Sequence, residues 1–214
     1  AIFDCDGDFL PDMYLAGGEN SARLYRNTSG GGISFEEVDA PELEVTGVAG
    51  AYPLDVDSDG IVDLAVLRVG ENLMMRGLGD CRFEPANDLW GIDGGDGWTV
   101  SFSATWEANE TWPTMVFADY IDLATVDNER TCASHVLYRP GGDGYSEPTP
   151  LEPGYCTLSA LFSDWDRSGR RDLRLTNDRH YYRDGSEQLW RLEPGAAPRL
   201  YTEADGWRSL QIWG

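Results

Sequence analysis

Short apolar stretches alternate along this chain with turns that are rich in glycine, proline and acidic residues. Residues 48–54, 64–69, 114–118 and 158–163 have the length and the apolar content of strands. No apolar pattern with a helical period extends beyond about three turns. The pattern therefore predicts an all-β protein.

The predicted strands recur four times with a period of roughly 50 residues. In each repeat an acidic loop lies between two strands, and the third strand ends on an aromatic residue or methionine followed by arginine. These pairs are Tyr25-Arg26, Met75-Arg76, Tyr138-Arg139 and Trp190-Arg191. Four strands at this period are typical of β-propeller blades. We divide the chain into repeats over residues 1–46, 47–112, 113–156 and 157–205, and we assign residues 206–214 to the first strand of a following blade.

Two arrangements of these blades are open. The chain begins with Ala1-Ile2-Phe3 directly before an acidic loop, so we expect it to be a piece of a longer secreted protein. Its cut blades would then pair with the rest of its own propeller or with a partner chain. In the alternative, residues 207–213 complete the first blade beside its residual strand and close a four-bladed propeller.

The clearest acidic loop covers residues 55–63 and is called loop 2. Its first, third, fifth and ninth positions are aspartates, and so many close carboxylates repel one another unless a cation gathers them. Calcium takes six to eight oxygen ligands, which such a loop supplies. We expect the ligands to be the side chains of Asp55, Asp57, Asp59 and Asp63 and the backbone carbonyl of Ile61.

Loop 2 differs from a helix-loop-helix calcium hand, because Val66 stands where that motif requires a bidentate glutamate. An apolar, β-branched segment follows the loop, so the loop joins strands and not helices. Gly60 is expected to supply the positive φ of the sharp turn.

Loop 1 covers residues 4–12 and has the same spacing of carboxylates. Phe9 stands where loop 2 has Gly60, and a bulky residue with positive φ is unfavourable. We therefore expect loop 1 to close differently and to bind calcium more weakly. Its expected ligands are Asp4, Asp6, Asp8, the carbonyl of Leu10, and Asp12.

Loop 4 covers residues 164–172 and keeps an oxygen at every ligand position. One aspartate is replaced by serine, and three arginines in the loop would repel a cation, so binding should be weaker. Its expected ligands are Asp164, Asp166, Ser168, the carbonyl of Arg170, and Asp172. We expect two or three calcium ions in all.

A third copy of the loop is degenerate. Asp119 and Asp127 keep the outer spacing, but Ile121 and Leu123 occupy inner ligand positions. We expect no metal there.

The formal net charge of −22 argues against a nucleic acid as a partner, because phosphate binding requires a basic face. Hydrophobic residues make up 41% of the chain, which is typical of a globular protein. The sequence contains no apolar run of the length that a membrane-spanning helix needs, so we expect no membrane span.

Four cysteines are present without the paired spacing of a zinc site. An even number fits disulfides in an oxidising compartment. We favour a bond between Cys132 and Cys156, which are closest in sequence, over one between Cys5 and Cys81. For Cys5 a buried free thiol is the simpler expectation.

A segment rich in tryptophan is a candidate ligand surface, because exposed aromatic rings stack on sugars and anchor protein interfaces. Its members are Trp90, Trp98, Trp106 and Trp112, and the alternative is that they fill the space between blades. His180 lies in a polar insertion that could join such a surface or carry catalysis. His135 is expected to be structural or exposed. No catalytic residue set is recognised.

The acidic units resemble the FG-GAP and VCBS repeats of calcium-binding β-propellers, which also occur in integrin α heads. The segments Leu24-Tyr25-Arg26-Asn27 and Phe35-Glu36-Glu37-Val38, and the unit from Asp164 to Tyr182, are similar to the secreted cartilage acidic protein type. This resemblance implies a propeller of roughly seven blades, of which about four are present, with ions that brace the blades.

The expected function is that of a secreted or cell-surface module, extracellular or periplasmic, that recognises a protein or glycan without catalysis. Two alternatives are an enzyme that acts on polysaccharide or a small substrate, and a structural subunit of a larger surface complex.

Overall fold

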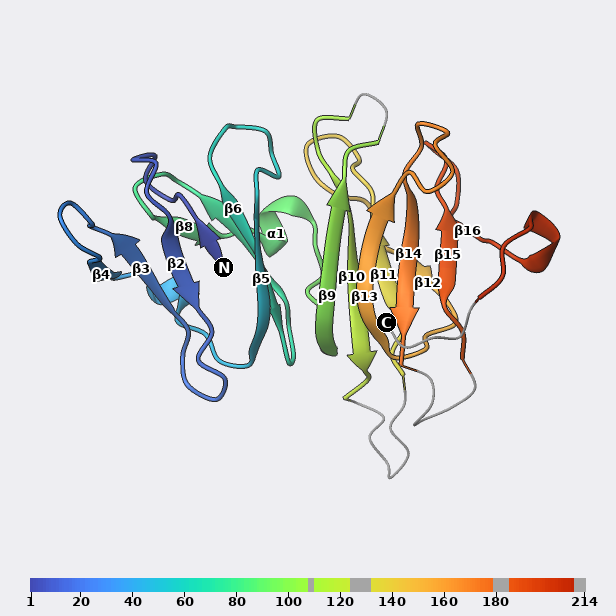
Figure 1. The fold of residues 1–214 in the computed structure, drawn as a ribbon, viewed down its shortest axis with the longest axis horizontal. Coiled ribbons are helices and arrows are strands. Elements are labelled where there is room, and N and C mark those ends of the chain that lie inside the picture. Colours follow the sequence, from blue (N-terminus) through green and yellow to red (C-terminus); the bar gives the residue numbers. More distant parts are fainter. Residues whose placement is uncertain (108–109, 124–131, 179–184, 210–214) are drawn as a thin grey trace. The chain divides into compact units, whose positions relative to one another are not determined.

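The computed structural model describes residues 1–107, 110–123, 132–178 and 185–209 of the chain. These residues form four antiparallel sheets of four strands each (Figure 1). The chain divides into two compact units, Ala1–Gly95 and Asp96–Gly214, which we describe separately. The predicted all-β class is confirmed.

Unit 1 contains two sheets whose strands follow one another in chain order. The first sheet consists of β1 (Ile2–Phe3), β2 (Asp12–Leu15), β3 (Arg23–Asn27) and β4 (Phe35–Val38). The second consists of β5 (Val48–Leu54), β6 (Asp63–Arg68), β7 (Leu73–Gly77) and β8 (Phe83–Pro85). Between the sheets lies a 3-10 turn, η1 (Pro41–Leu43), and after β8 comes a one-turn helix, α1 (Asn87–Trp90), which the sequence did not predict.

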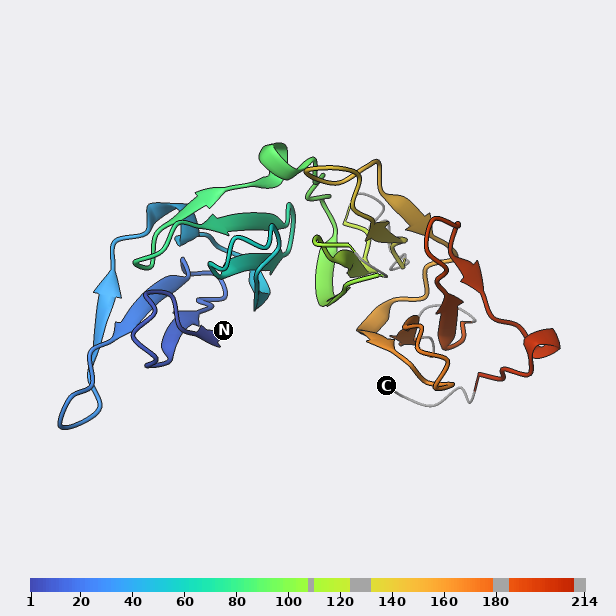
Figure 2. The same ribbon diagram turned by 90° about the horizontal axis from the view of Figure 1, so that it is seen from above.

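Unit 2 repeats this arrangement (Figure 2). The third sheet consists of β9 (Trp98–Thr105), β10 (Thr114–Ile121), β11 (His135–Tyr138) and β12 (Thr149–Leu151). The fourth consists of β13 (Thr157–Ser163), β14 (Asp172–Asn177), β15 (Gln188–Arg191) and β16 (Arg199–Leu200), and a 3-10 turn, η2 (Glu203–Asp205), follows it. No helix among the described residues has both the length and the apolar character to cross a membrane.

The start of the third sheet differs from the predicted repeats. Strand β9 falls within the predicted second repeat, 47–112, yet it pairs with β10 and belongs to the third sheet. The predicted boundary differs because no aspartate pattern follows β9, which makes β10 resemble the first strand of its repeat. At the C-terminus, residues 206–209 do not form the expected strand, and residues 210–214 lie outside the described residues.

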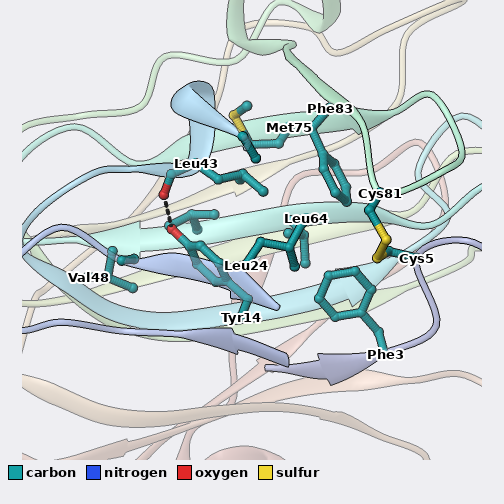
Figure 3. Packing of buried hydrophobic residues seen from close by; sticks show 13 residues of the cluster. Phe3, Cys5, Tyr14, Leu24, Leu43, Val48, Leu64, Met75, Cys81 and Phe83 are labelled. Atoms are coloured by element: carbon teal, nitrogen blue, oxygen red, sulfur yellow. Dashed lines mark hydrogen bonds between the residues drawn. A yellow bond between two sulfur atoms is a disulfide. The ribbon is translucent and has the colours of Figure 1, made fainter. Parts of the chain in front are cut away.

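The core of unit 1 is built from the alternating apolar positions of both sheets (Figure 3). Tyr14 of β2 is buried among them, and its hydroxyl donates a hydrogen bond of 2.8 Å to the carbonyl of Leu43. The rings of Phe3 and Phe83 meet edge-on with centroids 6.2 Å apart. The first and second sheets therefore share one core.

The third and fourth sheets share a second core, to which Leu137, Leu173 and Trp190 belong. Polar contacts add to it where β9 faces β13. The Oγ atom of Ser101 accepts a hydrogen bond of 2.8 Å from the backbone N–H of Ala160. Because β13 is an edge strand, this contact satisfies a backbone donor that its own sheet leaves open.

Candidate metal centres

The acidic loops join the first and second strands of their sheets at one fixed register. The residue before loop 2 pairs with its ninth residue, as Leu54 pairs with Asp63, and the same relation joins Phe3 to Asp12 and Ser163 to Asp172. The nine-residue spacing seen in the sequence is therefore set by strand pairing.

Loop 2 is organised by hydrogen bonds from its own backbone to its carboxylates. Asp55 accepts from the N–H of Gly60 at 3.1 Å, and Asp57 accepts from the N–H of Asp59 at 3.2 Å. Asp59 accepts from the N–H of Ile61 at 2.9 Å. Each of these bonds engages one oxygen of its carboxylate, so the loop is folded around its acidic side chains.

Asp63 ties loop 2 to the sheet. Its carboxylate is fully buried, and it accepts one hydrogen bond from the N–H of Val56 at 2.7 Å and another from the N–H of Gly77 at 2.8 Å. Burial raises the pKa of this carboxyl to about 7, the two N–H groups oppose the rise, and the charges of Asp57 and Asp59 add to it. A cation beside it would favour the ionised form.

One oxygen of loop 2 has no partner in the described part of the chain. Oδ1 of Asp55 is buried and accepts no hydrogen bond there. Carboxylate oxygens of Asp55, Asp57 and Asp63 lie within 4.8 Å of one another. A desolvated, unpaired carboxylate oxygen is strongly unfavourable, and a hard cation satisfies such oxygens. The side chains of loop 2 therefore fit calcium.

Loop 1 has the same backbone conformation as loop 2. Its left-handed residues are Gly7 (φ 81°) and Phe9 (φ 66°), and their counterparts in loop 2 are Ser58 (φ 59°) and Gly60 (φ 84°). The expectation that loop 1 closes differently is therefore wrong. Phe9 adopts the left-handed conformation, and its side chain is 92% exposed, so the ring meets no steric obstacle.

The carboxylates of loop 1 also converge. Oxygens of Asp4, Asp6 and Asp8 lie within 4.8 Å of one another. The buried Asp12 closes the loop as Asp63 does, because it accepts from the N–H of Cys5 at 2.8 Å and from the N–H of Asn27 at 2.8 Å. In loop 1 the aspartates at the first, third and fifth positions thus converge, whereas in loop 2 those at the first, third and ninth positions do.

Arginines from the third strands reach back to both loops. The guanidinium of Arg26 lies 3.0 Å from Asp6, and that of Arg76 lies 2.9 Å from Asp57 and 3.2 Å from Asp59. The sequence pattern identified these arginines as markers of the repeat but not as partners of the acidic loops. Their recurrence near the end of the third strand of each repeat was the signal that could have shown it.

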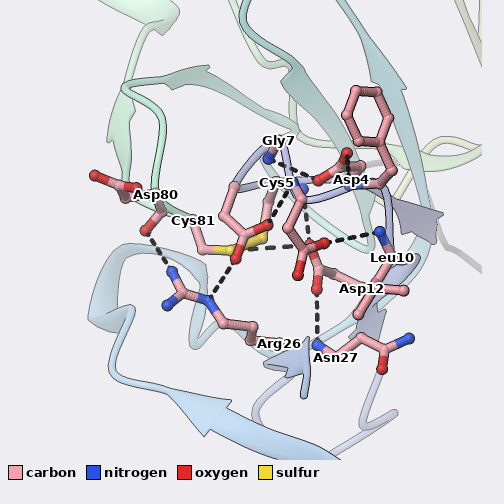
Figure 4. Close-up of a disulfide and its surroundings, with 12 residues drawn as sticks. Asp4, Cys5, Gly7, Leu10, Asp12, Arg26, Asn27, Asp80 and Cys81 are labelled. Atoms are coloured by element: carbon pink, nitrogen blue, oxygen red, sulfur yellow. Dashed lines mark hydrogen bonds and ion pairs between the residues drawn. A yellow bond between two sulfur atoms is a disulfide. The ribbon is translucent and has the colours of Figure 1, made fainter. Parts of the chain in front are cut away.

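A disulfide anchors loop 1 to the turn between β7 and β8 (Figure 4). It joins Cys5 to Cys81, so the expected free thiol is wrong, and the backbone N–H of Cys81 donates to the carbonyl of Cys5 at 2.9 Å. Arg26 donates to the carbonyl of Asp80 at 3.2 Å in the same turn. In unit 2 the expected bond between Cys132 and Cys156 is present.

Loop 4 has backbone-to-carboxylate hydrogen bonds like those of the other two loops, but an arginine side chain lies among its carboxylates. Asp164 accepts from the N–H of Gly169 at 3.1 Å, and Asp166 accepts from the N–H of Ser168 at 3.1 Å. The guanidinium of Arg170, however, lies 3.6 Å from Asp166. In the described part of the chain, the carboxylates of loop 4 do not converge as those of loops 1 and 2 do.

The closing residue of loop 4 is satisfied by internal donors. Asp172 is fully buried and pairs with Arg170 at 2.9 Å. It also accepts from the backbone N–H of Leu192, the indole of Trp165 and the hydroxyl of Tyr201. Burial would raise the pKa of Asp172, but the Arg170 guanidinium and these hydrogen bonds hold it below its usual value. The structure does not favour the expected ion in loop 4, because Arg170 supplies the positive charge.

The predicted third loop is misplaced. Asp119 lies within β10, where the hydroxyl of Thr99 donates to its carboxylate, and Asp127 lies outside the described residues. Because Thr105 pairs with Thr114, the true counterpart of the acidic loops is the segment between β9 and β10. There Thr114 occupies the position of Asp63.

In the third sheet, the segment between β9 and β10 contributes to an ion pair. Glu107 lies 2.8 Å from Arg139, the arginine that directly follows the third strand of this sheet. Glu107 also accepts a hydrogen bond of 2.6 Å from the hydroxyl of Thr114. Of the two glutamates in this segment, Glu107 and Glu110, Glu107 is already paired with an arginine.

The four tryptophans of the candidate ligand surface have different environments. Trp90 belongs to unit 1 and is buried, so its ring is not part of an exposed surface. Trp112 is half-buried and meets Tyr145 edge-on. Trp98 and Trp106 remain exposed, at 38% and 45%.

Of the two histidines, His180 lies outside the described residues. His135 is fully buried and shares a hydrogen bond of 2.7 Å with the hydroxyl of Thr157. Burial lowers the pKa of His135 to about 4. It is therefore neutral near pH 7 and structural, as expected.

Comparison with known proteins finds a match for one part of the chain. No curated protein matches the sequence. Residues 4–66 match the family model described as FG-GAP-like repeat. The match runs from the first residue of loop 1 through loop 2 into β6, so it includes both groups of converging carboxylates. The segment that carries the two candidate metal centres is thus similar to an FG-GAP-like repeat.

Proposed function

We propose that this chain is an extracellular recognition module in which loops 1 and 2 each hold one calcium ion that braces the fold. The observation that carries the proposal is the buried Oδ1 of Asp55, which accepts no hydrogen bond from the residues that the structure describes, together with the nearby carboxylates of Asp57 and Asp63. The ions would lie between the first and second strands of their sheets and do no chemistry. Their role is to neutralise carboxylates that the fold brings together.

The proposal assigns two ions and leaves loop 4 without one. In that loop Arg170 provides the charge that calcium provides in the others. An internal cation needs no supply of metal, so the fourth sheet would keep its loop folded at any calcium concentration.

We further propose that the four sheets are blades of a β-propeller of the secreted cartilage acidic protein type. Each sheet is a four-stranded antiparallel meander, which is the form of a propeller blade. Two disulfides within one chain fit a secreted or cell-surface protein, because such bonds persist in oxidising compartments. The FG-GAP-like match supports an integrin-like role in recognition, and the ligand would be a protein or a glycan.

Thermal melts with calcium, with magnesium and with chelator test this function. A ligand that binds only the native state adds about 2.7 kcal/mol of stability per site at a hundredfold excess over its Kd. We expect calcium to raise the Tm of the wild type clearly and magnesium to raise it little, because magnesium requires a stricter octahedral geometry. Equal melts in calcium and in chelator would rule out the bracing role.

A further inference from the structure

Unit 2 contains a cavity of about 830 Å³ that the proposed calcium sites do not use. Its wall is formed by the loop after β9, by loop 4 and by the segment that follows β15. The residues that carry the argument are Trp106, Glu107, Arg170, Arg171, Leu192 and Glu193. A volume of this size is typical of sites for small molecules.

The charged side chains of the wall are paired, with one exception. The pairs are Arg170 with Asp172 at 2.9 Å, Glu107 with Arg139 at 2.8 Å, and Glu193 with Arg191 at 2.5 Å. Arg171 is exposed, donates one hydrogen bond of 3.1 Å to the hydroxyl of Thr105, and has no ion pair among the described residues. The wall therefore carries one uncompensated positive charge in a strongly acidic protein.

An aromatic ring lines the same cavity. The indole of Trp106 is 45% exposed, and its N–H donates a hydrogen bond of 3.1 Å to the carbonyl of Thr111. That bond orients the ring and uses its only polar group. The negative face of an indole attracts the polarised C–H bonds of a sugar ring. Leu192 and Pro194 add an apolar wall to the same cavity.

We propose that this cavity binds a sugar ring that carries a carboxylate, that is, a uronic acid residue of a glycan. The ring would stack on Trp106, the carboxylate would pair with Arg171, and the carboxylates of Glu107 and Glu193 would accept hydrogen bonds from hydroxyls. This inference rests on the proposed recognition function and names its ligand class.

The net charge of the protein restricts the class of glycan further. A net charge of −22 repels polyanions, although salt screens this repulsion beyond about 8 Å at physiological ionic strength. A single uronic acid residue within an otherwise neutral glycan would therefore be preferred over a run of acidic sugars.

Titration with galacturonic acid and with galactose tests the assignment, because the two sugars differ at the carboxylate. Binding would be followed by ligand-observed NMR and by tryptophan fluorescence, at one fixed calcium concentration. We expect galacturonic acid to bind at least about tenfold more tightly than galactose, as a charged hydrogen-bonded pair implies.

Two variants and two matched controls localise the binding. Trp106→Ala should abolish binding of both sugars, and Arg171→Gln should remove the preference for galacturonic acid. Trp98→Ala removes another exposed indole, and Arg174→Gln removes an exposed arginine of β14, so both should bind as the wild type does. Because Arg171 is exposed, its variant should fold even if Trp106→Ala does not.

Equal affinity for the two sugars, or undiminished galacturonic acid binding by both cavity variants, would overturn the assignment. A calcium-dependent rise in Tm is measured on the same samples. If that rise persists while galacturonic acid does not bind, the cavity assignment fails alone. If binding persists without a calcium effect, the cavity assignment stands and the calcium proposal fails.

Discussion

The guanidinium of Arg170 lies 2.9 Å from the buried carboxylate of Asp172, at the place where loop 2 closes with Asp63. In loop 2 the corresponding carboxylate is held by two backbone N–H groups and faces other aspartates. The same loop frame is thus completed in two ways, by an arginine of the chain in loop 4 and, we propose, by a metal in loop 2.

Removal of the internal cation should destabilise unit 2. Arg170→Ala leaves Asp172 buried without its charge partner, and loss of one member of a buried pair lowers stability by about 3 kcal/mol or more. Part of this loss should be recovered in calcium, because the emptied loop regains room for a cation. Urea unfolding in calcium and in chelator measures both effects. Arg174→Ala, an exposed arginine of β14 without an ion pair among the described residues, should change stability little.

Replacement of the left-handed phenylalanine should stabilise loop 1. The left-handed conformation is unfavourable by about 1–2 kcal/mol for a residue with a Cβ atom, while glycine loses roughly 0.5–1 kcal/mol more conformational entropy on folding. Phe9→Gly should therefore raise stability by roughly 0.5–1 kcal/mol. Phe9→Ala removes the exposed ring but keeps the Cβ atom. If the alanine variant is as stable as the glycine variant, backbone strain at Phe9 is not the cause.

Acid should weaken the protein through His135. Its folded pKa of about 4 lies below the ordinary value of 6.5. Between these values the unfolded chain binds a proton that the folded chain does not, so stability rises with pH across this window. The shift corresponds to about 3 kcal/mol between pH 4 and pH 6.5.

A variant separates this effect from other titrations. Burial, together with the charges of Asp96 and Asp122, raises the pKa of Asp119 to about 6 against an opposing hydrogen bond from Thr99, and an acid with a raised pKa favours folding at lower pH. His135→Gln should reduce the rise of unfolding free energy with pH relative to the wild type. Parallel pH profiles of the two proteins would show that His135 does not titrate as described.

The disulfide between Cys5 and Cys81 should support calcium binding at loop 1 alone. Cys5 is the second residue of loop 1, and its bond fixes the loop to the turn after β7. A Cys5→Ser/Cys81→Ser variant should bind calcium more weakly at one site and unchanged at the other, as measured by calorimetric titration. The matched variant Cys132→Ser/Cys156→Ser removes the disulfide of unit 2 and should leave both affinities unchanged.

Sequence reasoning located loops 1, 2 and 4 because their nine-residue spacing reflects local strand pairing. It missed the loop after β9, where Thr114 replaces the closing aspartate. It placed the degenerate third copy at Asp119, which lies within a strand, because the distance from Asp119 to Asp127 imitates the spacing. Local sequence patterns cannot show where this loop lies, because the register between β9 and β10 determines its position.

Contacts between segments that are distant in the sequence also could not be predicted from it. Arg76 of β7 forms an ion pair with Asp57 of loop 2, which precedes β6. Cys5 forms a disulfide with Cys81, 76 residues further along the chain. The sequence predicts that Arg170 supplies a backbone carbonyl to the ion and that its positive charge repels the ion. Its side chain instead folds back onto Asp172, which only the packing of the fourth sheet reveals.

The most direct test of the account is the number of calcium ions bound per chain, measured by metal analysis after equilibrium dialysis. We expect two ions for the wild type and one for Asp55→Asn. The matched change in loop 4, Asp164→Asn, should leave the count at two. No bound calcium in the wild type, or an equal count in the wild type and Asp55→Asn, would contradict the central claim that the converging carboxylates of loops 1 and 2 are metal sites.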